Sequence, residues 1–140
     1  MKLLTPEDAE FWNPAWYLLQ LKIRTKMHGI QRFDLLDHQQ LMVAAVRRAY
    51  QEQRWLCHVK ARQTGSSTFF TGIVYQHITS RKGCWGAILA HKKNTAKNLA
   101  EMANRYWRTA PAWLKPERYG RAIKTLEFPK LESRLDVASV

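Results

Sequence analysis

The sequence has few cysteines and no recognisable metal-binding or hydrolase motif. Its two cysteines, Cys57 and Cys84, are isolated, and no C-x-x-C pair is present. Both lie in apolar stretches, so we expect buried, reduced thiols of the kind found in cytoplasmic proteins. The five histidines show no H-E-x-x-H spacing, and no G-x-S-x-G motif occurs. The chain itself therefore offers no predicted catalytic residues.

Long apolar runs are also missing. No stretch approaches the ~20 apolar residues that a membrane-spanning helix requires. The N-terminus becomes acidic at Glu7 and has no apolar run long enough for a signal peptide. We therefore expect a cytoplasmic protein without a membrane partner.

Acidic residues are scarce relative to basic ones. The 140-residue chain has 23 lysines and arginines against 11 acidic residues, a formal charge of +12. Such an excess favours a polyanionic partner, nucleic acid first and an acidic membrane surface second, over a surface that is basic only for solubility. A hydrophobic content of 46% with six tryptophans is enough for a packed core in one domain or part of one.

Hydrophobic periodicity and turn residues predict an α/β fold. The predicted helices start at Thr5-Pro6, restart at Asn13-Pro14, and then cover about 37–53, 67–79 and 94–108. The predicted strands are 55–59, 85–90, 123–128 and 134–139, the last two paired with each other, and residues 25–34 are predicted to form a loop. Strand, loop, helix, strand, helix is the order of a parallel βαβ topology.

This order divides the chain into two parts. Residues 1–36 form an N-terminal helical lead-in, and 37–140 form the α/β part. A parallel sheet of only two or three strands, with unpaired edge strands, is too small for a complete α/β domain. We therefore expect 37–140 to be an incomplete domain.

The segment from Val59 to Thr68 has the layout of a phosphate-binding loop. The common pattern is G-x-x-x-x-G-K-[ST], in which the lysine reaches the β- and γ-phosphates. Gly65 occupies the second glycine position and Ser67 the position of the magnesium ligand, but Ser66 replaces the lysine. A cation is present instead at Lys60, the first position of the pattern.

The loop predicts a site for ATP phosphates. Backbone N–H groups of residues 62–67 can form an anion-binding nest at the start of the following helix. Ser67 is the predicted Mg²⁺ ligand, and Thr68 can share its hydroxyl role. The predicted phosphate-binding residues are Lys60, Arg62, Gln63, Thr64, Gly65, Ser66, Ser67 and Thr68. The alternative is an ordinary strand-to-helix turn with Ser66 or Ser67 as helix N-cap.

Two glutamines precede the loop by about twenty residues. A glutamine amide can both donate to and accept from the edges of adenine, which selects ATP over GTP. Gln39 is the predicted adenine contact and Gln40 its alternate. The other interpretation is that both simply occupy the first turn of a helix.

A basic stretch interleaved with aromatic residues runs from His91 to Lys124. Lysine and arginine neutralise phosphates, and aromatic rings stack on exposed bases. Lys92, Lys93 and Lys97, just past the predicted strand, are the expected contacts with DNA or an acidic partner. The alternative is a solvated helix face with tryptophans in the core.

The loop and its surroundings resemble one protein family. The run Lys60-Ala61-Arg62-Gln63-Thr64-Gly65-Ser66-Ser67-Thr68 is similar to the Walker A segment of the large terminase subunits of tailed bacteriophages. Those ATPases often carry the basic residue at the beginning of the loop. The lead-in at 21–26, Phe33-Asp34-Leu35 with Gln39, the segment 87–99 and the strand pair 126–137 also resemble the family, so the similarity spans about 18–140.

The resemblance implies a P-loop NTPase-like DNA-packaging motor in the cytoplasm of a host cell. Members of the family use ATP and Mg²⁺ to drive double-stranded DNA into procapsids. They act as oligomers with a portal protein and a small terminase subunit. Carried over by position, Lys60 and Arg62 would contact phosphates, Ser67 would bind Mg²⁺ and Gln39 would bind adenine.

The sequence departs from the family in one respect. No apolar strand ending in Asp-Glu follows the loop, and no nuclease domain is present. Because those acids position Mg²⁺ and the attacking water, we expect the 140-residue chain to be inactive as an ATPase, as a truncated motor would be. The alternatives are the opening fragment of a superfamily 2 helicase, which usually keeps the lysine that Ser66 replaces, and a non-enzymatic basic DNA-binding module.

Overall fold

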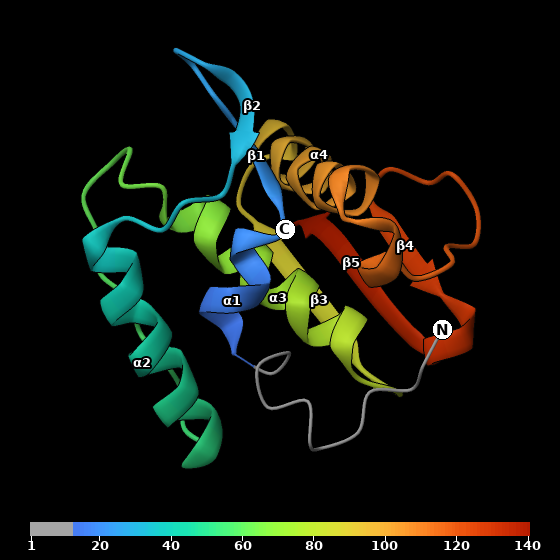
Figure 1. The fold of residues 1–140 in the computed structure, drawn as a ribbon, viewed down its shortest axis with the longest axis horizontal. Helices are drawn as coiled ribbons and strands as arrows, with labels where there is room; N and C mark the ends of the chain where they lie inside the picture. Colours follow the sequence, from blue (N-terminus) through green and yellow to red (C-terminus); the bar gives the residue numbers. More distant parts are fainter. Residues whose placement is uncertain (1–12) are drawn as a thin grey trace.

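The computed structural model describes residues 13–140, so the predicted helix start at Thr5 lies outside the described residues. The described part is a mixed α/β fold with two small sheets (Figure 1). Its helices are α1 (Pro14–Leu19), α2 (Asp37–Gln51), α3 (Ser66–Ser80) and α4 (Lys93–Thr109). Its strands are β1 (Lys22–Thr25), β2 (Gly29–Arg32), β3 (Trp85–Ala90), β4 (Thr125–Phe128) and β5 (Ser133–Ser139). None of the helices within 13–140 is long and apolar enough to cross a membrane.

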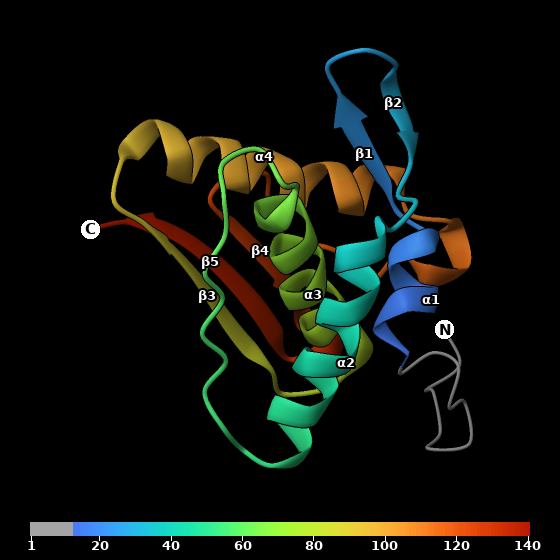
Figure 2. The same cartoon turned by 90° about the vertical axis from the view of Figure 1, so that its left-hand side faces the viewer.

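The larger sheet has the strand order β3-β5-β4. β3 and β5 are parallel, with Trp85 opposite Arg134, and α4 lies between them in the chain. β4 pairs antiparallel with β5, as the sequence predicts, which makes the sheet mixed rather than purely parallel. β3, α4 and β5 form a βαβ unit (Figure 2). The unit that the sequence predicts, from strand 55–59 through helix 67–79 to strand 85–90, is not formed, because 55–59 belongs to no strand among the described residues.

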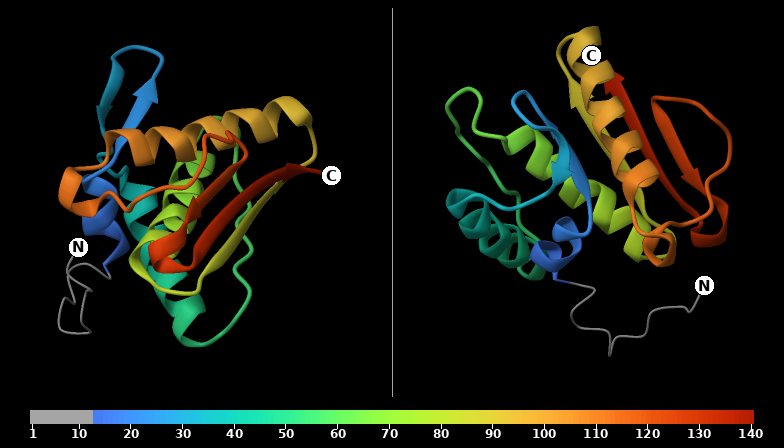
Figure 3. Two further views of the ribbon diagram at one scale, coloured as in Figure 1. Left: turned by 90° about the vertical axis from the view of Figure 1, so that its right-hand side faces the viewer. Right: turned by 45° about the horizontal axis from the view of Figure 1, so that its top comes forward.

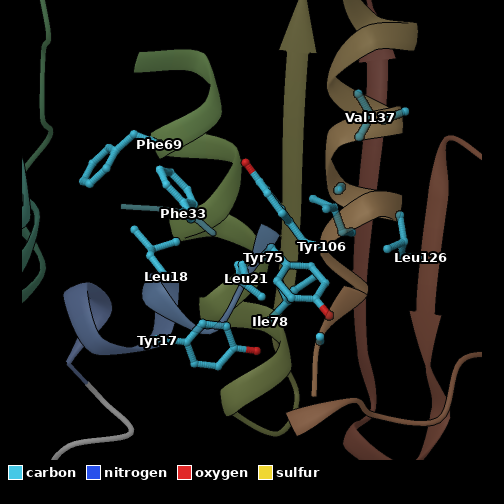
Figure 4. Packing of buried hydrophobic residues seen from close by; sticks show 14 of the residues in the cluster. Tyr17, Leu18, Leu21, Phe33, Phe69, Tyr75, Ile78, Tyr106, Leu126 and Val137 are labelled. Atoms are coloured by element: carbon cyan, nitrogen blue, oxygen red, sulfur yellow. The ribbon is translucent and has the colours of Figure 1, made fainter. Parts of the chain in front are cut away.

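The core lies between the helices and the larger sheet, and aromatic rings dominate it. Tyr17 of α1, Tyr75 of α3 and Tyr106 of α4 are fully buried and lie close together (Figure 4). Phe33, just after β2, stacks on Tyr106 with ring centroids 6.2 Å apart. The residues before α2 therefore share one core with α3 and α4.

α1 and α3 approach each other closely at a glycine. A Cβ added to Gly72 would lie 2.5 Å from Cδ2 of Leu18, so only glycine allows this contact. Asn13 begins α1 as predicted: its Oδ1 accepts a hydrogen bond from the backbone N of Ala15 at 3.1 Å.

The loop predicted at 25–34 is wrong at Thr25 and at 29–32, which belong to strands, whereas 26–28 form the turn between them. β1 and β2 form an antiparallel hairpin, in which Lys22 lies opposite Arg32 and Thr25 opposite Gly29. Gly29 closes the turn with a φ of +66°, and the Thr25 hydroxyl accepts a hydrogen bond from the His28 backbone N at 3.1 Å. The four-residue strands carry no regular apolar alternation, so the sequence pattern gave no signal for them.

The strand predicted at 55–59 is also wrong. The segment belongs to no strand among the described residues, and Trp55 and Val59 are almost fully exposed. Its apolar composition suggested a strand, but a strand needs a neighbour with which to share backbone hydrogen bonds. Cys57 lies in this segment and is exposed, which corrects the expectation of a buried thiol; Cys84 is half-buried.

Candidate functional site

The predicted phosphate-binding loop leads directly into α3. Gly65 is the residue before the helix and has a φ of +72°, a left-handed conformation that favours glycine. Its carbonyl accepts the first helical hydrogen bond from Phe69 N at 3.0 Å. The backbone N–H groups of Ser66, Ser67 and Thr68 therefore lie in the first turn, where an α-helix leaves its donors without helical partners. These groups give the end of the loop a partial positive charge.

Ser66 stands where the common pattern has lysine, and its side chain holds the loop together. The residue is 1% exposed, and its Oγ lies 2.8 Å from Oγ1 of Thr64. The imidazole Nε2 of His58 approaches the same oxygen to 3.2 Å. Since its hydroxyl is already engaged, Ser66 can offer a phosphate only its backbone N–H.

Lys60 and Ser67 share a cavity of about 400 Å³ at the outer edge of β3. Most of its remaining lining is apolar: Phe70 and Val74 come from α3, Leu89 from β3 and Leu99 from α4. His58, Ser66 and Thr71 add polar groups. Pockets that hold small organic ligands have this size and combine apolar walls with a few polar groups. The structure therefore joins three of the predicted phosphate-binding residues, Lys60, Ser66 and Ser67, to a space that can accept an organic anion.

The cations of the loop are available to a ligand. The Nζ of Lys60 is exposed and donates only a long hydrogen bond to the neighbouring Ala61 carbonyl, at 3.4 Å. Arg62 is exposed, and neither residue forms an ion pair within residues 13–140. Arg62 does not line the cavity, so Lys60 is the cation placed to reach its contents.

The two predicted adenine residues differ in their availability. Gln39 is 3% exposed: its Oε1 accepts from Leu36 N at 3.1 Å and its Nε2 donates to the Gly65 carbonyl at 3.2 Å. Gln40 is exposed, with a single long hydrogen bond of 3.5 Å to the carbonyl of Leu35. In this arrangement Gln39 fastens the loop to α2, and Gln40 is the amide open to a ligand.

Two histidines that the sequence did not single out also hold the loop. His38 Nε2 donates a hydrogen bond to the Thr64 carbonyl at 2.9 Å. His58 contacts Ser66 as described above. These contacts join positions 26 and 8 residues apart, and no local pattern signals them.

The first turn of α3 is tied to α4 by a buried tyrosine. The hydroxyl of Tyr106 donates to the Thr68 carbonyl at 2.9 Å. Burial raises the pKa of Tyr106 well above its usual value, so the hydroxyl remains a neutral donor. Thr68 thus has its carbonyl fixed by the core while its side chain remains half-buried.

The lysines predicted to contact DNA are not part of the cavity. Lys92 is the N-cap residue of α4, Lys93 begins the helix and Lys97 follows one turn later. All three are exposed, and none lines the cavity beside Ser67. Elsewhere in the basic stretch, Arg118 serves the fold: it donates to Oδ1 of Asn104 at 2.6 Å and to the Thr125 carbonyl at 3.2 Å.

A magnesium ion would find one protein ligand here. Ser67 offers an exposed hydroxyl at the cavity, and no group of three or more His, Cys, Asp or Glu residues able to hold a metal occurs within 13–140. Mg²⁺ commonly keeps several waters and takes one or two protein ligands together with substrate phosphates. The residues present therefore fit Mg²⁺ only as a companion of a bound nucleotide.

No protein-family model matches the chain, and no curated protein sequence matches it. The chemistry of the site follows from Gly65 with its positive φ, the exposed Ser67 and the unpaired Lys60 beside the cavity.

Proposed function

We propose that this chain is the N-terminal ATP-binding portion of a phage terminase large subunit, with a P-loop NTPase-like fold. The observation that carries the proposal is the junction of the loop with α3. Gly65 directs the chain into the helix, and Lys60 and Ser67 meet at one cavity. The loop sequence from Lys60 to Thr68, with its cation at the front, supports the same assignment.

The triphosphate would lie against the first turn of α3. The N–H groups of Ser66, Ser67 and Thr68 are suited to phosphate oxygens because they lack helical partners. Lys60, and Arg62 from outside the cavity, would neutralise the phosphate charge. Gln63 and Thr64 would contribute backbone N–H groups; Gln63 has a φ of +60°, which turns the chain before Gly65. The Ser67 hydroxyl would hold Mg²⁺, which would supply positive charge to the phosphates.

The base would occupy the open side of the loop. Gln40 is the exposed amide near the start of α2, and it is the adenine contact that the geometry favours over Gln39. Gln39 would act indirectly, because its hydrogen bond to the Gly65 carbonyl keeps the loop in position.

Binding and turnover are separate properties of this chain. The sequence after the loop has no apolar strand ending in Asp-Glu, which would activate the attacking water. The 140-residue chain would therefore bind ATP without hydrolysing it. In the parent motor, which would act in the host cell cytoplasm as an oligomer, ATP hydrolysis would be coupled to the movement of double-stranded DNA. A portal protein and a small terminase subunit would be its partners.

Titration with a fluorescent ATP analogue and Mg²⁺ tests this proposal. We expect saturable binding by the wild type and at least a tenfold loss, about 1.4 kcal/mol, in Lys60→Ala/Arg62→Ala. The matched control is Lys82→Ala/Arg121→Ala, which removes two exposed cations outside the loop and its cavity. Absence of binding by the wild type, or equal losses in both double variants, would contradict an ATP site at this loop.

One observation favours a second candidate, a non-enzymatic basic DNA-binding module. No strand directly precedes the loop among the described residues, because the element before it is α2, whereas phosphate-binding loops follow a strand. On this alternative, the protein binds duplex DNA but no ATP analogue. The same titration therefore separates the two functions.

A further inference from the structure

The β1–β2 hairpin projects from the body of the protein. It rises beyond α4 as a two-stranded ribbon with its turn pointing outward (Figures 1 and 3). All four residues of β2 are exposed, and in β1 only Ile23 and Thr25 are half-buried. Ile23 packs against the hydrophobic core, so it anchors the base of the ribbon. The rest of the hairpin is open to a partner.

The outer face of the hairpin is densely basic. Residues directly opposite in an antiparallel ladder share a face, so Lys22, Arg24 and Arg32 lie together, away from Ile23. Lys26 continues the series at the turn, and residues 22–32 contain no Asp or Glu. Like charges directly opposite each other, such as Lys22 and Arg32, destabilise a ladder. Among the ion pairs of residues 13–140, Arg32 is the one cation of the hairpin with a partner, Asp34 at 3.8 Å. This face is therefore suited to an anionic partner.

A groove continues the basic surface onto α4. It has a volume of about 560 Å³ and is lined by Arg24 and Lys26 from the hairpin and by Asn98, Glu101 and Arg105 from α4. Its three cations stand against the single carboxylate of Glu101. None of the three forms an ion pair in the part of the chain that the structure describes. The groove can thus accept further negative charge beside the hairpin.

We propose that residues 22–32 enter the major groove of double-stranded DNA, while Arg105 contacts the adjacent phosphate backbone. This inference rests on the proposed function for its choice of a DNA partner and names the surface that would hold it. The major groove of B-form DNA admits a two-stranded β-ribbon. The deep, narrow major groove of A-form RNA does not, so duplex RNA fits this surface less well. The contact surface is distinct from Lys92, Lys93 and Lys97, which lie at the N-terminal end of α4.

Two charge-matched triple variants test the assignment. Lys22→Gln/Arg24→Gln/Lys26→Gln removes three cations from the hairpin, and Lys92→Gln/Lys93→Gln/Lys97→Gln removes three from the start of α4. Binding of a labelled DNA duplex is measured by fluorescence anisotropy across a salt series. We expect the hairpin variant to lose at least tenfold in affinity for the duplex. The slope of log K against log salt concentration should fall in magnitude by about 2 to 3. The α4 variant should lose no more than about threefold. Equal losses in both variants would overturn the proposal.

Further measurements separate DNA binding at the hairpin from misfolding of the variant, from general binding of anions and from the ATP site. Arg105→Gln leaves the hairpin unchanged and should still weaken DNA binding by about threefold to tenfold, so the test does not depend on the folding of the triple variant. Duplex RNA or anionic lipid vesicles that bind as tightly as the DNA duplex would also overturn it. The ATP-analogue titration is repeated on both triple variants and should be unchanged. If the wild type binds DNA but not the ATP analogue, and the hairpin variant loses DNA binding, the ATP site is refuted and the hairpin assignment is still supported.

Discussion

At the scale of single residues, the loop depends on a contact between Gly65 and Gln39. Gly65 takes a left-handed φ of +72°, and a Cβ added there would lie 2.9 Å from Nε2 of Gln39. That amide cannot easily move away, because hydrogen bonds to Leu36 N and to the Gly65 carbonyl hold it at both ends. A substitution at Gly65 therefore meets backbone strain and a steric clash together.

We predict that Gly65→Ala lowers the free energy of unfolding by about 2 to 4 kcal/mol. Left-handed backbone costs a residue with a Cβ about 1–2 kcal/mol, and displacing the Gln39 amide from a buried position adds to that loss. Urea denaturation measures the effect. Binding of the ATP analogue should weaken in parallel, since Gly65 sets the direction of the first turn of α3.

Gly29→Ala is the matched control for this prediction. Gly29 has a similar φ of +66°, but an added Cβ would meet nothing within 4 Å. Its replacement should cost only the backbone term of about 1–2 kcal/mol. If both variants lose the same stability, the Gln39 amide yields to the new methyl group and the clash contributes nothing.

At the scale of elements, the sequence predicted the helices and the strand that are rich in apolar residues. α3, α4 and β3 lie within a few residues of their predicted bounds. The regular apolar face is clearest in α4, which buries Ala96, Ala100, Ala103 and Tyr106. The β1–β2 hairpin was missed because its short strands are mostly exposed. Segment 55–59 was mistaken for a strand because its apolar residues suggested burial. Whether an apolar run joins a sheet depends on a neighbouring strand, which local sequence does not specify.

The same limit applies to the candidate site. The loop motif, including Gly65 and Ser67, was visible as a local pattern. The roles of His38, His58 and Tyr106 were not, because each contacts the loop or α3 from another part of the chain. The sequence therefore predicted which residues could bind phosphate, but not which residues hold the loop in shape.

We predict that Trp55→Ser changes the free energy of unfolding by less than about 0.5 kcal/mol, the usual range for an exposed side chain without partners. Trp55 is fully exposed in a segment outside any described strand. The measurement is again urea denaturation of the purified variant.

Trp107→Ser makes the same chemical change at a packed position. Its ring packs against the core, and its Nε1 donates to the Pro116 carbonyl at 2.9 Å. We expect a loss of about 2 kcal/mol or more. A comparable loss for Trp55→Ser would mean that segment 55–59 is packed in solution, as the sequence-based prediction of a strand implied.

At the scale of the whole molecule, three buried tyrosines link the core to pH. Burial raises the pKa of Tyr17, Tyr75 and Tyr106 well above the usual value of about 10. The three rings come from α1, α3 and α4, so the tyrosinate form of any one of them would place a charge at the centre of the fold. The hydroxyl of Tyr17 lies 2.6 Å from Oγ1 of Thr79, whereas that of Tyr75 has no hydrogen-bond partner among residues 13–140.

We predict that the protein loses stability steeply above about pH 10, the unfolded-state pKa of tyrosine. A pKa raised in the folded state contributes stability that is fully present below the unfolded value and lost as pH rises toward the folded one. In this window each buried tyrosine lowers the free energy of unfolding by about 1.4 kcal/mol per pH unit, and the three together by about 4 kcal/mol per pH unit.

Tyr75→Phe tests the contribution of one ring. It should leave stability at neutral pH nearly unchanged, because no hydrogen bond is lost, and should reduce the slope of the free energy of unfolding against pH to about 3 kcal/mol per pH unit. Urea denaturation at a series of alkaline pH values measures both slopes, and an unchanged slope in Tyr75→Phe would show that this tyrosine ionises as readily in the folded protein as in the unfolded chain.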